Sequence, residues 1–222
     1  MNRIVAHIFS VIGHPMLILT YALLIALAVN PQQFGFSGMA DQRAVLLMIS
    51  VVTTTVMLPG LGVALLKPLG FIKSLQMGDK QERIGPYIIA GVFYLWLYKN
   101  LSSGGQTPSI YLTFVLGATI ALFFNFFINI FTKISAHAAG MGGFIAMILL
   151  MLKQPEWVKY GLGIPVFGGV LELSLFAVLA LVILLAGMVG TARLALNAHI
   201  PADLYRGYAA GFAAVLLASM IG

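Results

Sequence analysis

Apolar runs of about 20 residues recur along this chain, and they limit the folds that it can adopt. Hydrophobic residues make up 61% of its 222 residues, and only 8% are charged. A transmembrane helix needs about 20 mostly apolar residues, whereas a soluble domain carries about 25% charged residues. We therefore predict an all-α, polytopic transmembrane bundle of six to seven spans, built as a single integral membrane domain over residues 1–222.

The candidate spans follow one another with brief polar loops between them. The third span contains Tyr94, Trp96 and Tyr98, which suits a helix at the membrane interface. The sixth span is long for a single crossing and contains Pro165, so we expect a tilt or an early bend there. The predicted spans are residues 13–30, 44–66, 86–100, 108–131, 136–153, 162–190 and 204–221.

Charge and cysteine content restrict the partners and the chemistry. The net charge of +6 reflects a shortage of acids, with 12 Lys and Arg against 6 Asp and Glu. No basic cluster stands apart from the membrane-facing segments, which argues against nucleic acid and favours the bilayer's anionic head groups. The chain has no Cys, which excludes disulfides and thiolate chemistry. Gly207 and Gly211 would permit close helix approach, and thereby a homodimer.

Unusual polar residues gather in three segments, Lys73 to Pro86, Lys133 to His137 and Arg193 to Asp203. Two predicted spans separate the first segment from the second, and two more separate the second from the third. An even number of crossings returns the chain to the same side of the membrane. We therefore expect the three segments to form one composite site at one membrane face, within residues 73–203.

The segment from Arg193 to Asp203 holds a cation, an imidazole and a carboxylate. Such groups are costly near hydrocarbon and are therefore functional candidates. His199 and Asp203 are four residues apart, which places both on one face of a helix, and Pro201 between them favours a first helical turn. Their chemistry suggests an Arg that holds phosphate, a nucleophilic or proton-transferring His and an Asp that orients it. The alternative is an interfacial His beside an Asp that merely starts a helix.

A second histidine belongs to the segment from Lys133 to His137. Ser135 and His137 stand at the start of a predicted span, where a hydroxyl, a nearby cation and helix N-terminal N–H groups favour an anion. The alternative is a basic flank at the membrane interface, with Ser135 as a helix cap. We interpret His137 as functional and Lys133 as the flank.

The most charged stretch of the chain runs from Asp79 to Arg83. Lys80 and Arg83 are three residues apart and would share one face of a helix, which would make them a two-cation clamp for a phosphoryl group. The alternative is a solvated loop in which Asp79 and Glu82 pair locally. Arg83 adjoins the span that starts at Pro86 and is the better candidate of the two cations.

Together the three segments resemble the signature of the type-2 phosphatidic acid phosphatase superfamily, which includes class A bacterial acid phosphatases and vanadium haloperoxidases. That signature reads Lys-x6-Arg-Pro, then Pro-Ser-Gly-His, then Ser-Arg-x5-His-x3-Asp. The third motif matches in spacing as Arg193-x5-His199-x3-Asp203, and the second is similar to Ser-Ala-His at residues 135–137. The resemblance covers most of the chain, because its motifs span residues 73–203.

The chain departs from this signature at several positions. Arg83 is followed by Ile-Gly-Pro rather than directly by Pro, and Gln76 stands where the motif has Lys. The role of that Lys is left to Lys80, to Lys73 or to neither. Ala192 replaces the Ser before the motif Arg, which removes one phosphate hydrogen bond.

The resemblance implies hydrolysis of a lipid phosphate or diphosphate without a metal or other cofactor, and the carboxylates are indeed too sparse for a two-metal site. His199 would attack phosphorus and form a phosphohistidine, while Asp203 would orient its imidazole. His137 would protonate the leaving oxygen and later help to activate water. The phosphate-binding residues implied are Arg83, Arg193, Ser135 and Lys80.

Three hypotheses are open for the function. The first is hydrolysis of a phospholipid or polyprenyl phosphate, such as phosphatidylglycerol phosphate, undecaprenyl diphosphate or phosphatidic acid. The second is a phosphotransferase with the same intermediate but another acceptor, and the third is an anion or lipid transporter. Relatives in the superfamily imply a bacterial inner membrane with the site facing the periplasm, whereas the distribution of Lys and Arg does not decide the orientation.

Other polar residues receive structural interpretations. Glu172 is predicted inside a span, as a hydrogen-bonding group between helices or in a cavity wall. Asn125 and Asn129 are expected to pack helices together. His14 precedes Pro15 and is expected to cap the first span.

Overall fold

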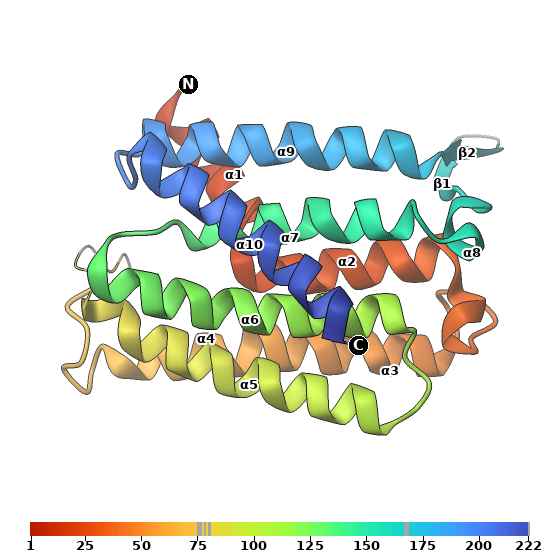
Figure 1. The fold of residues 1–222 in the computed structure, drawn as a ribbon, viewed down its shortest axis with the longest axis horizontal. Helices are drawn as coiled ribbons and strands as arrows, with labels where there is room; N and C mark the ends of the chain where they lie inside the picture. Colours follow the sequence, from red (N-terminus) through yellow and green to blue (C-terminus); the bar gives the residue numbers. More distant parts are fainter. Residues whose placement is uncertain (75–76, 78, 80, 167–168, 222) are drawn as a thin grey trace.

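The computed structural model describes all residues except 75–76, 78, 80, 167–168 and 222, and Figure 1 shows long helices that run side by side in a bundle. A hairpin of two antiparallel strands, β1 (Leu162–Val166) and β2 (Gly169–Leu173), lies at one end of the bundle. The α-helices are α1 (Arg3–Ile12), α2 (Pro15–Val29), α3 (Gln42–Val52), α4 (Leu58–Leu66), α5 (Ile84–Ser103), α6 (Ser109–Phe131), α7 (Ala136–Met151), α8 (Pro155–Val158), α9 (Leu175–Ala195) and α10 (Pro201–Ile221). The short helical segments are η1 (Pro31–Phe34), η2 (Thr53–Met57) and η3 (Gln81–Arg83).

The prediction of a helical integral membrane protein is confirmed in its coarser form. Within the described residues, four helices are long and apolar enough to cross a membrane, namely Gln42–Leu66, α6, α9 and α10. The bent pair α1 and α2 gives a fifth if the two form one span. α7 is apolar but has 16 residues, and α5 is long enough but carries several Tyr, Trp, Lys and Asn residues. The outer faces of α6 and α9 expose large apolar side chains, which suits contact with lipid.

The predicted span over residues 162–190 is wrong at its start. Residues 162–166 and 169–173 form the two strands of the β-hairpin, and α9 begins only at Leu175, with the hydroxyl of Ser174 accepting a hydrogen bond from a backbone N–H of the first turn. The Gly, Val, Ile and Pro residues of this stretch disfavour a helix and allow a strand. Glu172 is therefore exposed in β2 rather than inside a span, and its predicted role between helices is wrong.

The chain bends by 59° between α1 and α2. His14 caps α2, because its Nδ1 accepts a hydrogen bond from the N–H of Met16 at 3.4 Å, as the sequence predicts. Gly13 lies against α9, where an added Cβ would come 2.9 Å from Cγ1 of Val189. α1 therefore packs on α9, while α2 turns away to pack on α6 and α7.

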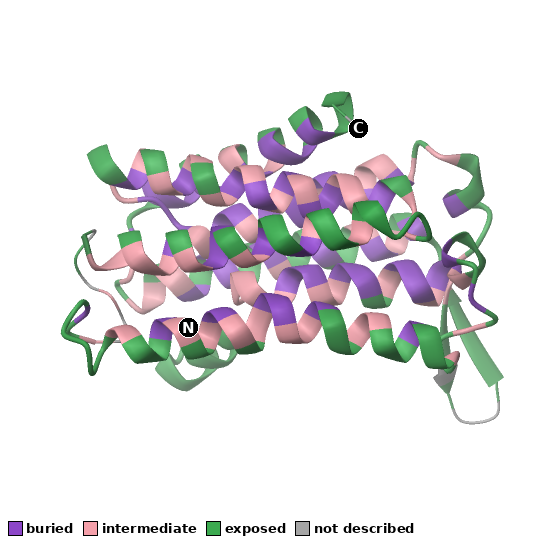
Figure 2. Ribbon diagram, turned by 90° about the horizontal axis from the view of Figure 1, so that it is seen from below, coloured by how far each residue is buried: buried purple, intermediate pink, exposed green. Residues whose placement is uncertain are grey.

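α7 is the most enclosed helix of the bundle, with α2, α6, α9 and α10 packed around it. Figure 2 shows the buried residues concentrated inside the bundle and the exposed ones on its outer helices. α10 crosses α7 very closely, since a Cβ at Gly211 would overlap the carbonyl of Ala139 and a Cβ at Gly207 would lie 2.6 Å from the carbonyl oxygen of Ser135. These two glycines serve a contact within the chain, so their spacing gives no support to a homodimer.

The three polar segments lie at the same end of the bundle, as the count of crossings predicts. Figure 1 shows the end of α4, the connection from α6 to α7 and the connection from α9 to α10 together at the left. The β-hairpin, α8 and the connection from α5 to α6 lie at the opposite end. The fold therefore brings residues far apart in sequence to one end, which we call the site end.

Candidate functional site

The connection between α6 and α7 is the centre of the candidate site, because the other two segments bond to its backbone. Arg83 donates from Nη1 to the carbonyl oxygen of Ile134 at 3.4 Å. The N–H of Ser135 donates to the carbonyl oxygen of Asp203 at 3.2 Å. One side-chain bond and one backbone bond therefore link the first and third segments to the connection between α6 and α7.

His199 and Asp203 form a buried pair at the start of α10. Nδ1 of His199 lies 3.2 Å from Oδ2 of Asp203, and the same oxygen accepts a hydrogen bond from the N–H of Ile200 at 3.4 Å. Because a carboxylate only accepts, Nδ1 carries the proton and Nε2 keeps its lone pair. The i, i+4 spacing predicted this contact, and the pairing leaves Nε2 of the imidazole unoccupied by Asp203.

Burial lowers the pKa of the His199 imidazole from 6.5 to about 4, against the opposing effect of its hydrogen bond with Asp203. The positive charges of Arg83, Arg193 and Lys133 lower this pKa further. The imidazole is therefore neutral at pH 7, which is the state a nucleophile needs.

One cation from each of the three segments acts on this pair. The charges of Arg83, Arg193 and Lys133 all lower the pKa of His199, and we call these three residues the cation cluster. Burial lowers the pKa of Lys133, and the neighbouring charge of Arg83 lowers it further. Lys133 therefore belongs to the cation cluster, and its interpretation as a flank at the membrane interface stays a prediction. Lys80, predicted as a clamp residue, lies outside the described residues.

Arg193 is held by a residue that the sequence did not indicate. Its Nη1 donates to Oγ of Ser10 at 2.6 Å, while its Nε is buried and has no hydrogen-bond partner in the part of the chain that the structure describes. A buried guanidinium whose N–H has no partner is suited to donate a hydrogen bond to an anionic oxygen. Arg193 thus offers the cluster a donor that no described residue uses.

His137 is bound through one of its two ring nitrogens. Nε2 lies 3.1 Å from the carbonyl oxygen of Ser10, which can only accept, so Nε2 carries the proton and Nδ1 is the nitrogen that can exchange one. The ring also meets that of His14 edge-on, with 5.3 Å between centroids. Proton transfer by His137 would therefore pass through Nδ1.

Ser135 is a helix cap. It is fully buried, and its Oγ accepts a hydrogen bond from the N–H of Ala138 at 3.3 Å. The structure thus favours the alternative of a helix cap over the implied role as a phosphate ligand. Lys73 is exposed, and its backbone N–H donates to Glu82 at 2.7 Å, so Glu82 pairs locally as the loop alternative predicts.

Ser10 and His14 are the site residues that sequence reasoning missed. Ser10 joins Arg193 through its hydroxyl and His137 through its carbonyl, and it is 8% exposed. No pattern in the sequence marks Ser10, because its contacts arise from the packing of α1 on α9. The sequence His14-Pro15 predicted a helix cap, but it did not predict the contact between the rings of His14 and His137.

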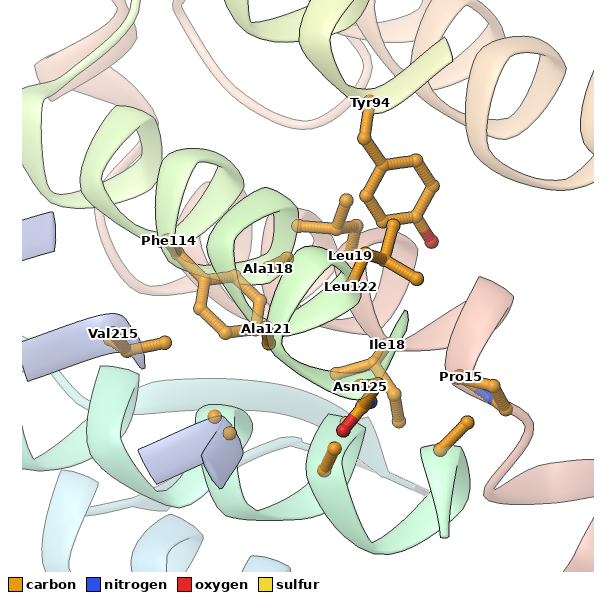
Figure 3. Close-up of a pocket in the computed structure, with 15 residues that line it drawn as sticks. Pro15, Ile18, Leu19, Tyr94, Phe114, Ala118, Ala121, Leu122, Asn125 and Val215 are labelled. Atoms are coloured by element: carbon orange, nitrogen blue, oxygen red, sulfur yellow. The ribbon is translucent and has the colours of Figure 1, made fainter. Parts of the chain in front are cut away.

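A small cavity lies beside the site, between α2, α6 and α7, with a volume of about 50 Å³. Figure 3 shows Pro15, Ile18 and Asn125 among the residues that line it, and Ala136, next to His137, lines it too. Oδ1 of Asn125 is buried without a hydrogen-bond partner among the described residues. The cavity has room for a few water molecules, and Asn125 supplies a polar group for them.

Among the described residues, no group of three or more His, Cys, Asp or Glu is placed to hold a metal ion. No family model, no curated protein and no solved structure matches this chain. The likeness to the phosphatase signature therefore rests on the motif residues themselves, and the function has to be argued from the geometry around them.

Proposed function

We propose that this protein is a membrane phosphatase that hydrolyses a lipid phosphate or diphosphate through a phosphohistidine on His199. The buried pair of His199 and Asp203 within a cluster of three cations is the observation that carries the proposal. A neutral imidazole with its Nδ1 proton on a carboxylate is an oriented nucleophile. Cations around it suit the anionic group that such a nucleophile would attack.

In the proposed reaction the non-bridging phosphate oxygens bind Arg83, Arg193 and Lys133. Nε2 of His199 attacks phosphorus, and the bond from phosphorus to the leaving oxygen breaks, which leaves a phosphohistidine. Water then attacks phosphorus, the N–P bond breaks, and inorganic phosphate departs. His137, when its ring carries a proton on both nitrogens, would donate the Nδ1 proton to the leaving oxygen, and the freed Nδ1 would then take a proton from the attacking water. The cations would stabilise the charge that develops between these steps.

The proposal extends to the membrane setting. We infer a bacterial inner membrane with the site end at the periplasm, and six to seven crossings if α5 and α7 also span. Phosphatidylglycerol phosphate, undecaprenyl diphosphate and phosphatidic acid all present the group that the cation cluster would bind. A phosphotransferase would share the first step and differ only in the acceptor, whereas a transporter would need polar groups along its spans rather than at one end.

The test is release of inorganic phosphate from these three lipids by the detergent-purified protein in the presence of a chelator. We expect chelator-resistant release that is lost in His199→Ala. His7→Ala is the matched control, because His7 is exposed on α1, and it should release phosphate like the wild type. Folded wild-type protein that releases no phosphate from any of the three lipids would contradict the proposal.

A further inference from the structure

An apolar groove of about 430 Å³ runs along the bundle between α2 and α9. The bend at Gly13 and His14 creates it, because α1 stays against α9 while α2 leaves toward α6 and α7. α7 forms the floor between the two diverging helices, and β1 meets the groove near the end opposite the site. Its lining includes Tyr21 and Leu24 of α2, Phe144 of α7, Leu181 and Leu185 of α9, and Leu162 of β1.

The groove opens sideways, toward the surface that the membrane would cover. Leu181 is 53% exposed and Leu24 is 37% exposed, although both line it. Its volume lies within the range of ordinary ligand sites, which is about 300–1,000 Å³. Hydrocarbon that entered from the bilayer would meet a floor and two walls of apolar side chains.

One end of the groove lies toward the site end. Ile12 lines it, and the same helix carries Ser10, which bonds both Arg193 and His137. Along α9, Leu185 lies eight residues from Arg193, or about 12 Å at 1.5 Å per residue. Val178, which also lines the groove, lies about 22 Å away along the same helix axis. Since half of the hydrocarbon core is about 15 Å thick, the groove continues past the membrane midplane.

We propose that this groove holds the hydrocarbon chain of the lipid whose phosphate binds at Arg83, Arg193 and Lys133. This inference rests on the proposed function and names the part of the protein that selects the substrate's tail. The cavity beside Asn125 is unsuited to that role, because it is small and carries a polar oxygen with no hydrogen-bond partner among the described residues. The groove instead offers almost only apolar side chains at the depth that a chain anchored at the site end would reach.

The first test compares a long-chain lipid phosphate with a short-chain, water-soluble analogue of the same head group. Leu181→Trp should fill part of the groove and raise KM for the long-chain substrate by about tenfold, which equals the loss of about two buried methylene groups. KM for the short-chain analogue should stay at the wild-type value. Leu184→Trp is the matched control, because Leu184 has a similar exposure on α9 but does not line the groove. An equal loss on both substrates, or no change on the long one, would overturn the inference.

The second test needs no catalysis. The indole introduced by Leu181→Trp should be quenched by a lipid phosphate with a brominated chain, and unbrominated lipid phosphate should relieve the quenching, whereas phosphatidylcholine should not. The signal of the wild type, which contains two Trp, is subtracted. Hydrolysis without this specific quenching overturns the groove assignment alone. Specific quenching without hydrolysis upholds the groove as a lipid phosphate site and overturns the proposed phosphatase.

Discussion

His199 depends on two opposing influences at the level of single residues. Its burial and the surrounding cations keep the imidazole neutral, while Asp203 fixes which nitrogen carries the proton. The carboxylate also accepts the N–H of Ile200, so it is itself held in place at the start of α10. Reactivity in the proposed mechanism therefore depends on the tautomer of His199 as much as on its position.

Asp203→Asn tests this dependence with almost no change in side-chain volume. The amide can donate to Nδ1, which would place the imidazole proton on Nε2 and remove the nucleophilic lone pair. We expect phosphate release to fall by about 10⁴-fold, the loss seen when an oriented histidine has its carboxylate replaced by an amide. Phosphate release and the melting temperature are measured together. A folded Asp203→Asn protein with wild-type activity would exclude a role for this tautomer.

The lowered pKa of His199 also predicts a pH dependence of stability. In the unfolded chain this imidazole titrates near 6.5, and in the folded protein near 4, so the unfolded state binds the proton first as the pH falls. The contribution of His199 to the free energy of unfolding is therefore complete above pH 6.5 and is lost progressively as the pH falls from 6.5 to about 4. The melting temperature should fall more between pH 7.5 and pH 5 in the wild type than in His199→Gln, which lacks the titrating group. An equal fall in both proteins would show that His199 is not the group responsible.

At the scale of helices, the crossing of α7 and α10 holds the site together. Ser135 caps the start of α7, His137 lies in the first turn of α7, and Asp203 lies in the first turn of α10. The distance between these helices therefore sets the distance between the second and third motifs. Gly207 and Gly211 allow the backbones to approach without a side chain between them. This crossing is therefore the packing contact on which the site geometry depends most directly.

Gly211→Ala and Gly187→Ala make a matched pair for this crossing. An added Cβ at Gly211 would overlap the backbone carbonyl of Ala139, whereas nothing lies within 4 Å of one at Gly187 on α9. Alanine favours a helix over glycine by about 1 kcal/mol, so Gly187→Ala should keep or raise the melting temperature. Gly211→Ala should lower the free energy of unfolding by about 1–3 kcal/mol or more, because the two helices must separate. A melting temperature that rises equally in both variants would contradict the close crossing.

At the scale of the whole molecule, the sequence predicted which segments meet but not everything that surrounds them. Counting crossings placed the motifs at one end, and the i, i+4 spacing predicted the pair of His199 and Asp203. These arguments succeed because they depend on helix geometry and membrane thickness, both of which are regular. The role of Ser10 could not be predicted, because its contacts follow from the packing of α1 on α9 and no local sequence pattern encodes that packing.

The β-hairpin shows a second limit of the sequence. Residues 162–190 form one apolar run, and an apolar run alone does not distinguish a strand pair from the start of a span. The Gly and β-branched residues at the start of the run favour strands over a helix, and they indicate the hairpin. The prediction that Glu172 lies inside a span is wrong for the same reason, because it rested on the length of the apolar run.

Orientation can be measured by labelling, because the chain has no native Cys. Leu69→Cys is exposed after α4 at the site end, and Ser103→Cys is exposed at the end of α5 on the opposite side. In intact cells, a membrane-impermeant maleimide should label Leu69→Cys and leave Ser103→Cys unlabelled. Permeabilised cells, in which both should react, serve as the control. The reverse pattern would place the site in the cytoplasm, and labelling of both in intact cells would contradict a bundle that spans the membrane.

The N–H of Arg193 that no described residue uses, together with the positive charges around it, has a consequence for turnover. Inorganic phosphate presents the same oxygens as the lipid head group, so the cluster that binds the substrate would also retain the released product. Inorganic phosphate would then compete with the lipid phosphate for the cation cluster and inhibit the reaction. The hydrocarbon tail would make the lipid bind more tightly than inorganic phosphate. Dephosphorylation of the lipid would slow as phosphate accumulates outside the membrane, which would make the enzyme responsive to the phosphate supply of its compartment.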